Sequence, residues 1–363
     1  MATNTVTTNL WTTFGVRYPG ETNAGIRENI QDQLTNIDPD DTPTVSLLPK
    51  TTADNLFVTW MIDALTATST AAAAEGAEFS ADQLFARTRL DNWIQRFRKD
   101  FALSQDQIEL AKRGGMIGVH DAMAHEAGRA SREILRNINC RLWSNSTATA
   151  SAAGIAEMDY VTGGASPSVT AATSTTAGQM RNLRYFGQYV GWKNPGTTET
   201  AVTGGVTANV NGAIATGSLF DLHEAMYMYG ISPDTLIVSP GVKRDLSRLL
   251  LNDTTLGLVR NTDAVKGESY APVVEIIRTD FGKIAVLVDR WMPQSSATGA
   301  NGAWQSAAYA LVDKSRIRLA YWRNLKPYSL PPSGDNMRAF MLAALTVQVT
   351  HPRAIGLGLG VTT

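Results

Sequence analysis

Several short patterns in this chain hold residue types that could do chemistry, but each is incomplete. Asp280-Phe281-Gly282 matches the metal-binding triplet of protein kinases, yet no H-R-D loop and no V-A-I-K strand accompanies it. Alternating Gly and Leu at 356–360 resemble part of a dinucleotide-binding fingerprint, but too few residues follow for a helix that would hold a pyrophosphate. His120 and His125 are spaced so that a helix would point them to different faces, which does not suit a metal site.

The same patterns predict structural features instead. We expect a hairpin turn at 280–282 and a terminal strand at 356–360. Cys140 is the only cysteine, and no nearby residue could act as its base, so we expect a buried small side chain and not a nucleophile. The sequence therefore predicts neither an enzyme nor a protein that binds a metal ion or a cofactor.

The charge of the chain is nearly balanced overall but uneven along its length. The formal net charge is -1 and the sequence pI is about 6.4, which excludes a global basic field for binding nucleic acid non-specifically. Residues 1–83 carry three basic and eleven acidic side chains, whereas residues 84–143 carry eleven basic and seven acidic ones. This asymmetry favours docking of an acidic arm onto the basic flank of another copy; two solvated faces of one subunit are the alternative.

A long ribbon is the element that must position these charges. The outgoing strand shows the period of two expected of a half-buried strand, and the segment from 66 to 76 contains mostly small residues. An isolated two-stranded ribbon is only marginally stable in water, so we expect it to lean on a neighbouring subunit. The apolar positions of the outgoing strand are Leu56, Val58, Trp60, Ile62 and Ala64. The basic positions of the return arm are Arg87, Arg89, Arg96, Arg98 and Lys99.

An unusually long helix is predicted after the ribbon. Ser104 and Gln107 form a capping box that opens a short helix, and the long helix is expected to begin near Ile117. About 28 helical residues would give a rod of roughly 40 Å. Its single apolar stripe consists of Met123, Ala127, Ala130, Ile134, Ile138 and Leu142. The arginines placed largely outside that stripe are Arg129, Arg132, Arg136 and Arg141.

The second half of the chain is predicted to be mixed α and β. Residues 145–217 are rich in Thr, Ala, Gly and Ser, which is typical of a loop-rich surface insertion. Helices are expected at 218–229 and 240–251. Strands are expected at 235–238, 273–279, 283–289, 308–312, 316–321 and 339–350.

The order of these elements resembles the major capsid protein of tailed bacteriophages, with its Hong Kong 97-type coat fold. Segments that carry the likeness include Ile37-Asp38-Pro39-Asp40-Asp41-Thr42-Pro43 and Thr235-Leu236-Ile237-Val238-Ser239-Pro240. The resemblance implies an α+β fold with an N-terminal arm, an extended loop, a long spine helix, a peripheral domain and an axial domain. The implied boundaries are 1–54 for the arm, 55–103 for the extended loop, 104–150 for the peripheral domain with the spine helix, 151–290 for the axial domain with its loop-rich insertion, and 291–363 for the peripheral domain sheet.

The resemblance also implies a function and partners. Many copies would form hexamers and pentamers of an icosahedral shell around packaged double-stranded DNA, assembled in the host cytoplasm as a virion capsid, without sequence-specific DNA binding and without a membrane. The loop begins by about residue 55, which leaves no room for a scaffolding segment, so a separate scaffolding protein is expected beside a portal and, in some such capsids, a decoration protein. No lysine lies between Lys50 and Lys99, so covalent welding of subunits through a loop lysine is not expected.

The resemblance implies that the extended loop lies over the adjacent subunit, and aromatic side chains are expected to anchor this contact because they dominate the energetics of interfaces. An encapsulin-type nanocompartment shell shares the fold and stays an alternative. A decorated soluble enzyme and a tail or fibre protein are further alternatives, although a fibre would show repeats and none is found. The residues expected to contact a neighbouring subunit are Trp60, Phe85, Arg87, Arg89, Trp93, Arg96 and Arg98.

Overall fold

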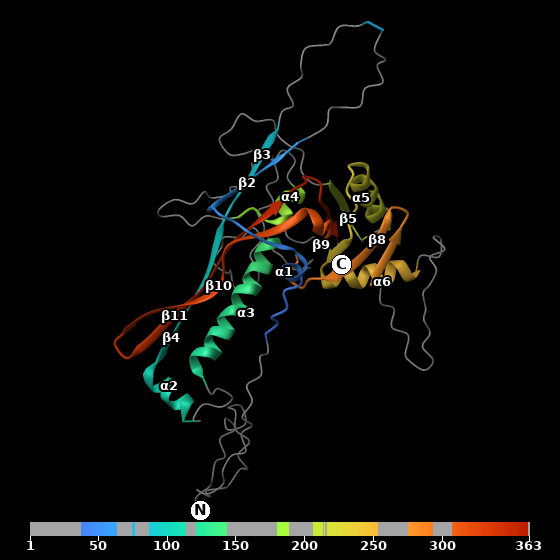
Figure 1. Ribbon diagram of the computed structural model, residues 1–363. Helices are drawn as coiled ribbons and strands as arrows, with labels where there is room; N and C mark the ends of the chain where they lie inside the picture. The colour runs from blue at the N-terminus through green and yellow to red at the C-terminus, as the bar shows by residue number, and fades with distance from the viewer. Residues whose placement is uncertain are drawn as a thin grey trace, which may run out of the picture.

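A computed structural model of the chain describes residues 38–63, 75–76, 87–113, 121–143, 180–188, 206–212, 214, 216–252, 275–292 and 307–361. The described strands form three sheets (Figure 1). The four-stranded sheet has the order β1-β10-β11-β4. It consists of β1 (Lys50–Thr52), β10 (Ile317–Ser333), β11 (Asn336–Val349) and β4 (Gln95–Ser104).

The six-stranded sheet has the order β5-β12-β9-β6-β8-β7. It is mixed, because β12 runs parallel to β5 and β8 runs parallel to β6, whereas β9 is antiparallel to both of its neighbours. Its strands are β5 (Val206–Gly212), β6 (Thr235–Val238), β7 (Ile276–Thr279), β8 (Gly282–Val288), β9 (Ala307–Val312) and β12 (Ile355–Val361).

The two-stranded sheet is the predicted ribbon. It pairs β2 (Phe57–Ile62) with β3 (Thr88–Trp93) in antiparallel register, with Phe57 opposite Trp93 and Ile62 opposite Thr88. The predicted alternation is therefore confirmed as a strand over Phe57–Ile62, whereas Leu56 precedes the strand and is exposed, and Ala64 lies outside the described residues. The small-residue segment at 66–76 lies outside the described residues except for 75 and 76.

Helix α3 (Ala122–Trp143) lies along the four-stranded sheet and is the predicted spine (Figure 1). It begins at Ala122 and not near Ile117, because the carboxylate of Asp121 accepts hydrogen bonds from the backbone N–H groups of Met123 and Ala124 and so caps the helix. Residues 114–120 lie outside the described part of the chain. The predicted stripe is confirmed in its fully buried members, which are Ala130, Ile134, Ile138 and Leu142.

Shorter helices complete the fold. The capping box of Ser104 and Gln107 opens α2 as predicted. Helices α5 and α6 begin and end within two residues of their predicted bounds. No helix in the described part of the chain is long and apolar enough to span a membrane. The remaining bounds are α1 (Pro43–Leu47), α2 (Gln105–Lys112), α4 (Leu183–Gln188), α5 (Thr216–Met228), α6 (Pro240–Asn252) and the 3-10 helix η2 (Lys314–Arg316).

The six-stranded sheet separates two apolar cores. On one face, Leu236 and Leu311 pack with α5 and α6. On the other face, Ile237 and Ala310 belong to a larger core shared with α3, α4 and the four-stranded sheet. Alternate residues of one strand thus enter different cores, as the two-residue period of a strand requires.

Strand pairing crosses the domain boundaries that the resemblance implies, and those boundaries stay predictions. Strand β4 lies within the predicted extended loop 55–103 but pairs with β11 in the four-stranded sheet. Strands β9 and β12 lie within the predicted peripheral sheet 291–363 but pair in the six-stranded sheet. These pairings depend on partners far away in the chain, which no local pattern encodes.

Candidate assembly surfaces and their anchors

The base of the β2–β3 ribbon is anchored in its own chain. The side chains of Trp60 and Leu90 belong to the larger core, and the ring of Trp60 lies 6.4 Å from that of Phe186 on α4. Only 9% of Trp60 is exposed. The ribbon was expected to lean on a neighbouring subunit, but its base packs against its own chain. These apolar contacts offset the poor stability of an isolated ribbon.

A buried polar cluster fixes the same base. The guanidinium of Arg181 donates from Nη1 to the Asp91 carboxylate at 3.0 Å, and both side chains are almost fully buried. The Asn92 amide donates to the carbonyl oxygens of Arg181 and Val347, while Arg181 N donates back to Asn92 Oδ1 at 2.8 Å. The cluster therefore ties the return strand to the segment before α4 and to β11.

Arg141 takes part in this anchor and was wrongly predicted to lie outside the buried stripe. Its side chain is buried and donates to Gln95 Oε1 at 3.0 Å and to the carbonyl oxygen of Met180 at 3.3 Å. Burial lowers the pKa of the guanidinium to about 10. Arginine can be accommodated at this helical position because its long side chain reaches polar partners at the end of the helix.

The aromatic residues predicted to contact a neighbour are placed differently from one another. Trp60 faces the core, as described above. Trp93 is half-buried, and its ring packs on that of Phe57 at a centroid distance of 4.7 Å. Phe85 lies outside the described residues.

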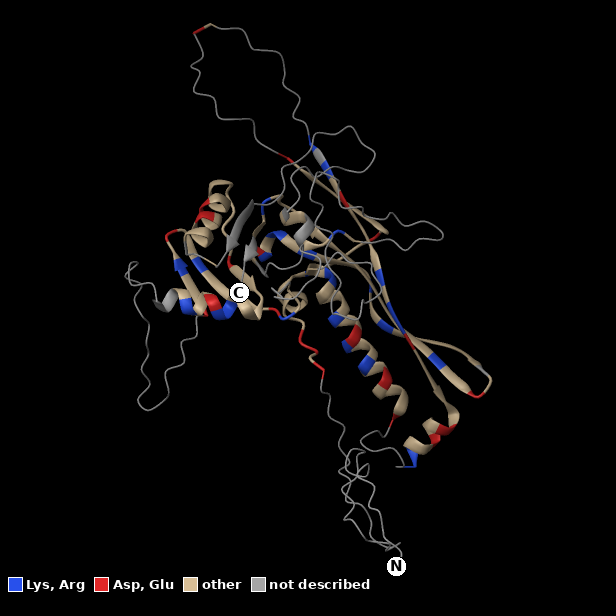
Figure 2. Ribbon diagram, turned by 180° about the vertical axis from the view of Figure 1, so that it is seen from behind, with Lys and Arg blue, Asp and Glu red and all other residues tan. Residues whose placement is uncertain are grey.

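The predicted arginines are all exposed, and several lie against aromatic rings. Arg96 lies 5.6 Å from the ring centre of Trp322, and Arg98 lies 4.7 Å from that of Phe340. Such contacts hold a cation in place while leaving it accessible. The return arm thus presents a basic surface (Figure 2). The exposed members are Arg87, Arg89, Arg96 and Arg98.

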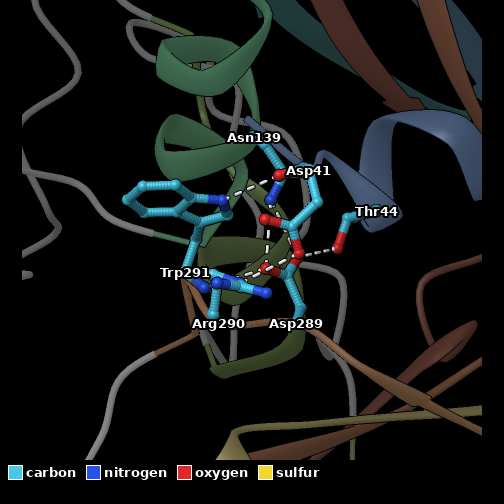
Figure 3. A network of polar contacts seen from close by, with 6 residues as sticks. All are labelled: Asp41, Thr44, Asn139, Asp289, Arg290 and Trp291. Atoms are coloured by element: carbon cyan, nitrogen blue, oxygen red, sulfur yellow. Dashed lines mark hydrogen bonds and ion pairs between the residues drawn. The ribbon is translucent and has the colours of Figure 1, made fainter. Parts of the chain in front are cut away.

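The second anchor holds the N-terminal arm and centres on a buried carboxylate (Figure 3). Asp289 follows β8 and is fully buried. Its carboxylate accepts hydrogen bonds from Thr44 Oγ1 at 2.5 Å and from Asn139 Nδ2 at 2.8 and 3.1 Å. The backbone N–H of Trp291 donates to the same group at 2.9 Å, and Trp143 Nε1 donates to Thr44 Oγ1. The network joins α1 of the arm, α3 and the six-stranded sheet.

Exposed ion pairs extend the arm anchor. Arg290 Nε lies 3.0 Å from Asp41 Oδ2, and Trp291 Nε1 donates to the carbonyl oxygen of Asp41 (Figure 3). Arg132 on α3 pairs with Asp40 at 3.6 Å. Part of the acidic arm therefore docks on basic residues of its own chain, which neither docking on another copy nor two solvated faces had predicted for these two aspartates.

The residues considered first for chemistry occupy structural positions. Asp280 and Phe281 form the turn between β7 and β8, as predicted. Strand β12 contains the glycines at 356–360, also as predicted. Cys140 is partly buried, and burial, together with the charge of Asp289, raises the pKa of its thiol to about 12. Within the described residues no group of three or more His, Cys, Asp or Glu side chains could hold a metal ion.

Sequence reasoning missed the arm anchor. Thr44, Asn139 and Asp289 carry no motif and are distant from one another in the chain. One signal was available: Asn139 lies beside Ile138 in the predicted buried stripe, and a buried polar side chain needs hydrogen-bond partners.

Comparison with solved structures shows what this architecture is. The chain is similar to the capsid protein of a native GTA particle, with a TM-score of 0.60 and 13% identity over 96% of this chain and 100% of the other. The cyanophage A-1(L) capsid gives a TM-score of 0.58 and 14% identity over 93% of this chain and 98% of the other. The capsid of Myoviridae phage XM1 gives a TM-score of 0.55 and 9% identity over 93% of this chain and 100% of the other. The fold is therefore the Hong Kong 97-like coat fold of phage capsids.

The sequence itself identifies the family. Residues 3–362 match the family described as SU10 major capsid protein, and the chain belongs to that family. It is a non-enzymatic structural component of the virion that forms an icosahedral phage capsid. No curated protein matches the sequence. The family match favours the phage coat over the nanocompartment shell that the fold alone left open.

Proposed function

We propose that copies of this chain associate as hexamers and pentamers, and that the resulting shell encloses packaged double-stranded DNA. The observation that carries this proposal is the family match over nearly the whole chain. The near-neutral net charge of -1 supports a container role, because DNA held by many wall contacts to phosphate could not leave freely.

The extended loop is proposed to contact the neighbouring subunit. The β2–β3 ribbon supports this role because its base is fixed by the Asp91–Arg181 pair, so that the rest of the loop starts from a defined point and direction. The contact is proposed to use the exposed arginines of the return arm together with Trp93 and Phe85. Because Trp60 is buried in its own core, its proposed role is to hold the base of the ribbon.

Further partners are proposed from the same function. Shell closure at the correct size is expected to need a separate scaffolding protein, and DNA entry is expected to need a portal. A decoration protein is proposed to bind only to the outer surface of a completed shell.

Deletion of residues 66–80 tests the loop contact. The deleted subunit should keep the thermal melt of the full chain, because both anchors lie outside the deletion, yet it should yield no closed particles in electron micrographs. Deletion of residues 153–167, an equally long part of the loop-rich insertion, is the matched control. Normal particles from the 66–80 deletion would refute the proposed contact. Failure of the full chain, expressed with its scaffolding partner, to form particles would refute the assembly proposal itself.

A further inference from the structure

Helix α5 presents an acidic stripe on its exposed side. Asp221, Glu224 and Met228 follow one another at helical spacings of three and four, and all three are exposed. Leu222 and Met226 point the opposite way, into the core against the six-stranded sheet. Among the described residues neither carboxylate has an ion-pair partner. Met228 is 76% exposed, the highest value among the large apolar side chains of the described residues.

A basic surface, opposite in charge to the stripe on α5, lies on the β7–β8 hairpin. Ile277 points into the core beneath α5 and α6, so Ile276 and Arg278 point to the other side of the sheet. Ile276 is 61% exposed. Arg278 lies directly opposite Lys283 in the antiparallel register, and both are exposed.

This cross-strand pair is unfavourable in an isolated subunit. Like charges that lie directly opposite each other destabilise a sheet. Within the described part of the chain no carboxylate comes within ion-pair distance of Arg278 or Lys283. Strand β7 lies at the outer edge of the six-stranded sheet, and Leu287 near the far end of β8 is the hairpin residue that packs against the core shared with α3 and α4. A partner that brings carboxylates and an apolar side chain to this face would relieve the repulsion and cover Ile276.

The acidic stripe meets this description, but within the described part of one chain it forms no ion pair with Arg278 or Lys283, although His223 and Tyr227 of α5 pack on Phe281 at the hairpin turn. Helix α5 covers one face of the sheet, whereas Ile276, Arg278 and Lys283 point from the other. Figure 2 shows the acidic positions on α5 and the basic positions on the hairpin as separate sites. Two different complementary surfaces on one chain make a head-to-tail contact, which closes into a ring when the rotation between copies is suitable.

We propose that the acidic stripe of α5 in one copy docks on the basic face of the β7–β8 hairpin in the next copy. Asp221 and Glu224 pair with Arg278 and Lys283, and Met228 packs beside Ile276. This contact rests on the proposed assembly into hexamers and pentamers, and it identifies surfaces that join neighbours within one ring.

Charge reversal and its rescue test the contact. The double variant Arg278→Glu and Lys283→Glu, and separately Asp221→Lys and Glu224→Lys, should each lower the yield of particles about tenfold or more, because each brings like charges together across the contact. Combining all four substitutions should restore the yield. Lys112→Glu with Arg113→Glu on α2 makes the same change in net charge as the first pair and is the control. The full chain is expressed with its scaffolding partner throughout, and particles are counted by sedimentation and electron microscopy.

The outcomes separate this contact from the assembly proposal. If the wild-type chain forms no particles, the assembly proposal fails. If it does and each double variant assembles normally, only the docking proposal is overturned. If the hairpin variant formed no particles but the α5 variant assembled normally, the hairpin face would bind something else, such as nucleic acid. That result would also overturn the docking proposal. If both double variants lost particles and the fourfold variant did not restore them, the stripe of α5 and the hairpin face would not contact each other.

A disulfide test covers the case in which the fourfold variant folds poorly. Glu224→Cys and Lys283→Cys are introduced together into a Cys140→Ser chain, and assembled particles are oxidised. The docking predicts a ladder of linked subunits on a non-reducing gel that reductant removes, while each single-cysteine chain gives no ladder. Assembled particles with both cysteines and no ladder would overturn the proposal.

Discussion

The ribbon and the arm are each anchored by a buried aspartate, but the two carboxylates are stabilised differently. Asp91 at the ribbon base pairs with the cation Arg181. Asp289 at the arm junction accepts hydrogen bonds from the neutral side chains of Thr44 and Asn139 and from backbone N–H. Within the described residues no cation lies at ion-pair distance from Asp289.

This difference sets how each anchor responds when it is broken. Removing one member of a buried ion pair leaves an uncompensated charge in the interior, which costs about 3–5 kcal/mol. Removing a carboxylate that accepts neutral donors leaves unsatisfied polar groups, which costs about 1–3 kcal/mol. Breaking the ribbon anchor should therefore destabilise the subunit more than breaking the arm anchor. Both anchors rest on α3, through Arg141 and Asn139.

The largest effect is expected from a substitution in α3, because both anchors involve residues of this helix. Ile134 is almost fully buried in the stripe of α3, so Ile134→Asp places a carboxylate without a partner in the larger core. We expect a loss of more than about 4 kcal/mol, and hence a misfolded or aggregated subunit. Circular dichroism and a thermal melt of the unassembled subunit measure it. A wild-type melt would mean that the stripe does not hold the core together.

Asp91→Ala should break the ribbon anchor at a cost of about 3–5 kcal/mol, because the charge of Arg181 stays buried after the loss of the carboxylate and keeps only polar contacts such as that from Nη1 to the carbonyl oxygen of residue 91. Adding Arg181→Leu should recover most of this loss, since an apolar replacement of a buried pair is often neutral. Urea unfolding of the unassembled subunits gives both values. If the double variant were no more stable than Asp91→Ala, the loss could not be attributed to the unpaired charge.

Asp289→Ala should be milder, with a loss of about 1–3 kcal/mol from the donors left unsatisfied. The effect that distinguishes this variant from Asp91→Ala is confined to the arm. Hydrogen exchange at the amides of α1 should speed up, including that of Val45, which donates to Asn139 Oδ1. Asp91→Ala serves as the control and should leave these amides slow. Equal exchange of α1 in the two variants would contradict the view that the anchors act separately.

The elements that the sequence predicts well are those that local chemistry specifies. The capping box at Ser104, the β7–β8 hairpin across Asp280-Phe281-Gly282 and the apolar strand at 235–238 were all found where expected. Each depends on residues that are neighbours in the chain. The stripe of α3 was recognisable for the same reason, since helical period needs no distant partner.

The elements that the sequence misses depend on distant contacts. Strand β10 continues to Ser333, well past the predicted end at 321, through a segment with three prolines that is held by pairing with β11. Strand β5 lies within the predicted loop-rich insertion and is held by β12. The Asp289 network joins residues up to 245 positions apart. Tertiary pairing overrides weak local preference in these places.

The smallest effect is expected at the exposed end of the arm anchor, where Arg132 pairs with Asp40. Both side chains are about half exposed, and exposed ion pairs contribute only about 0.2–1 kcal/mol. Arg132→Ala should therefore leave the fold intact and lower the melting temperature only slightly, and high salt should remove the difference from wild type because it screens the pair. Arg129→Ala, one turn earlier on α3 and paired with Glu133, is the matched control that leaves the arm untouched. If Arg132→Ala cost as much as Asp289→Ala, the arm would be held mainly by its surface charges, and the buried carboxylate would not be its anchor.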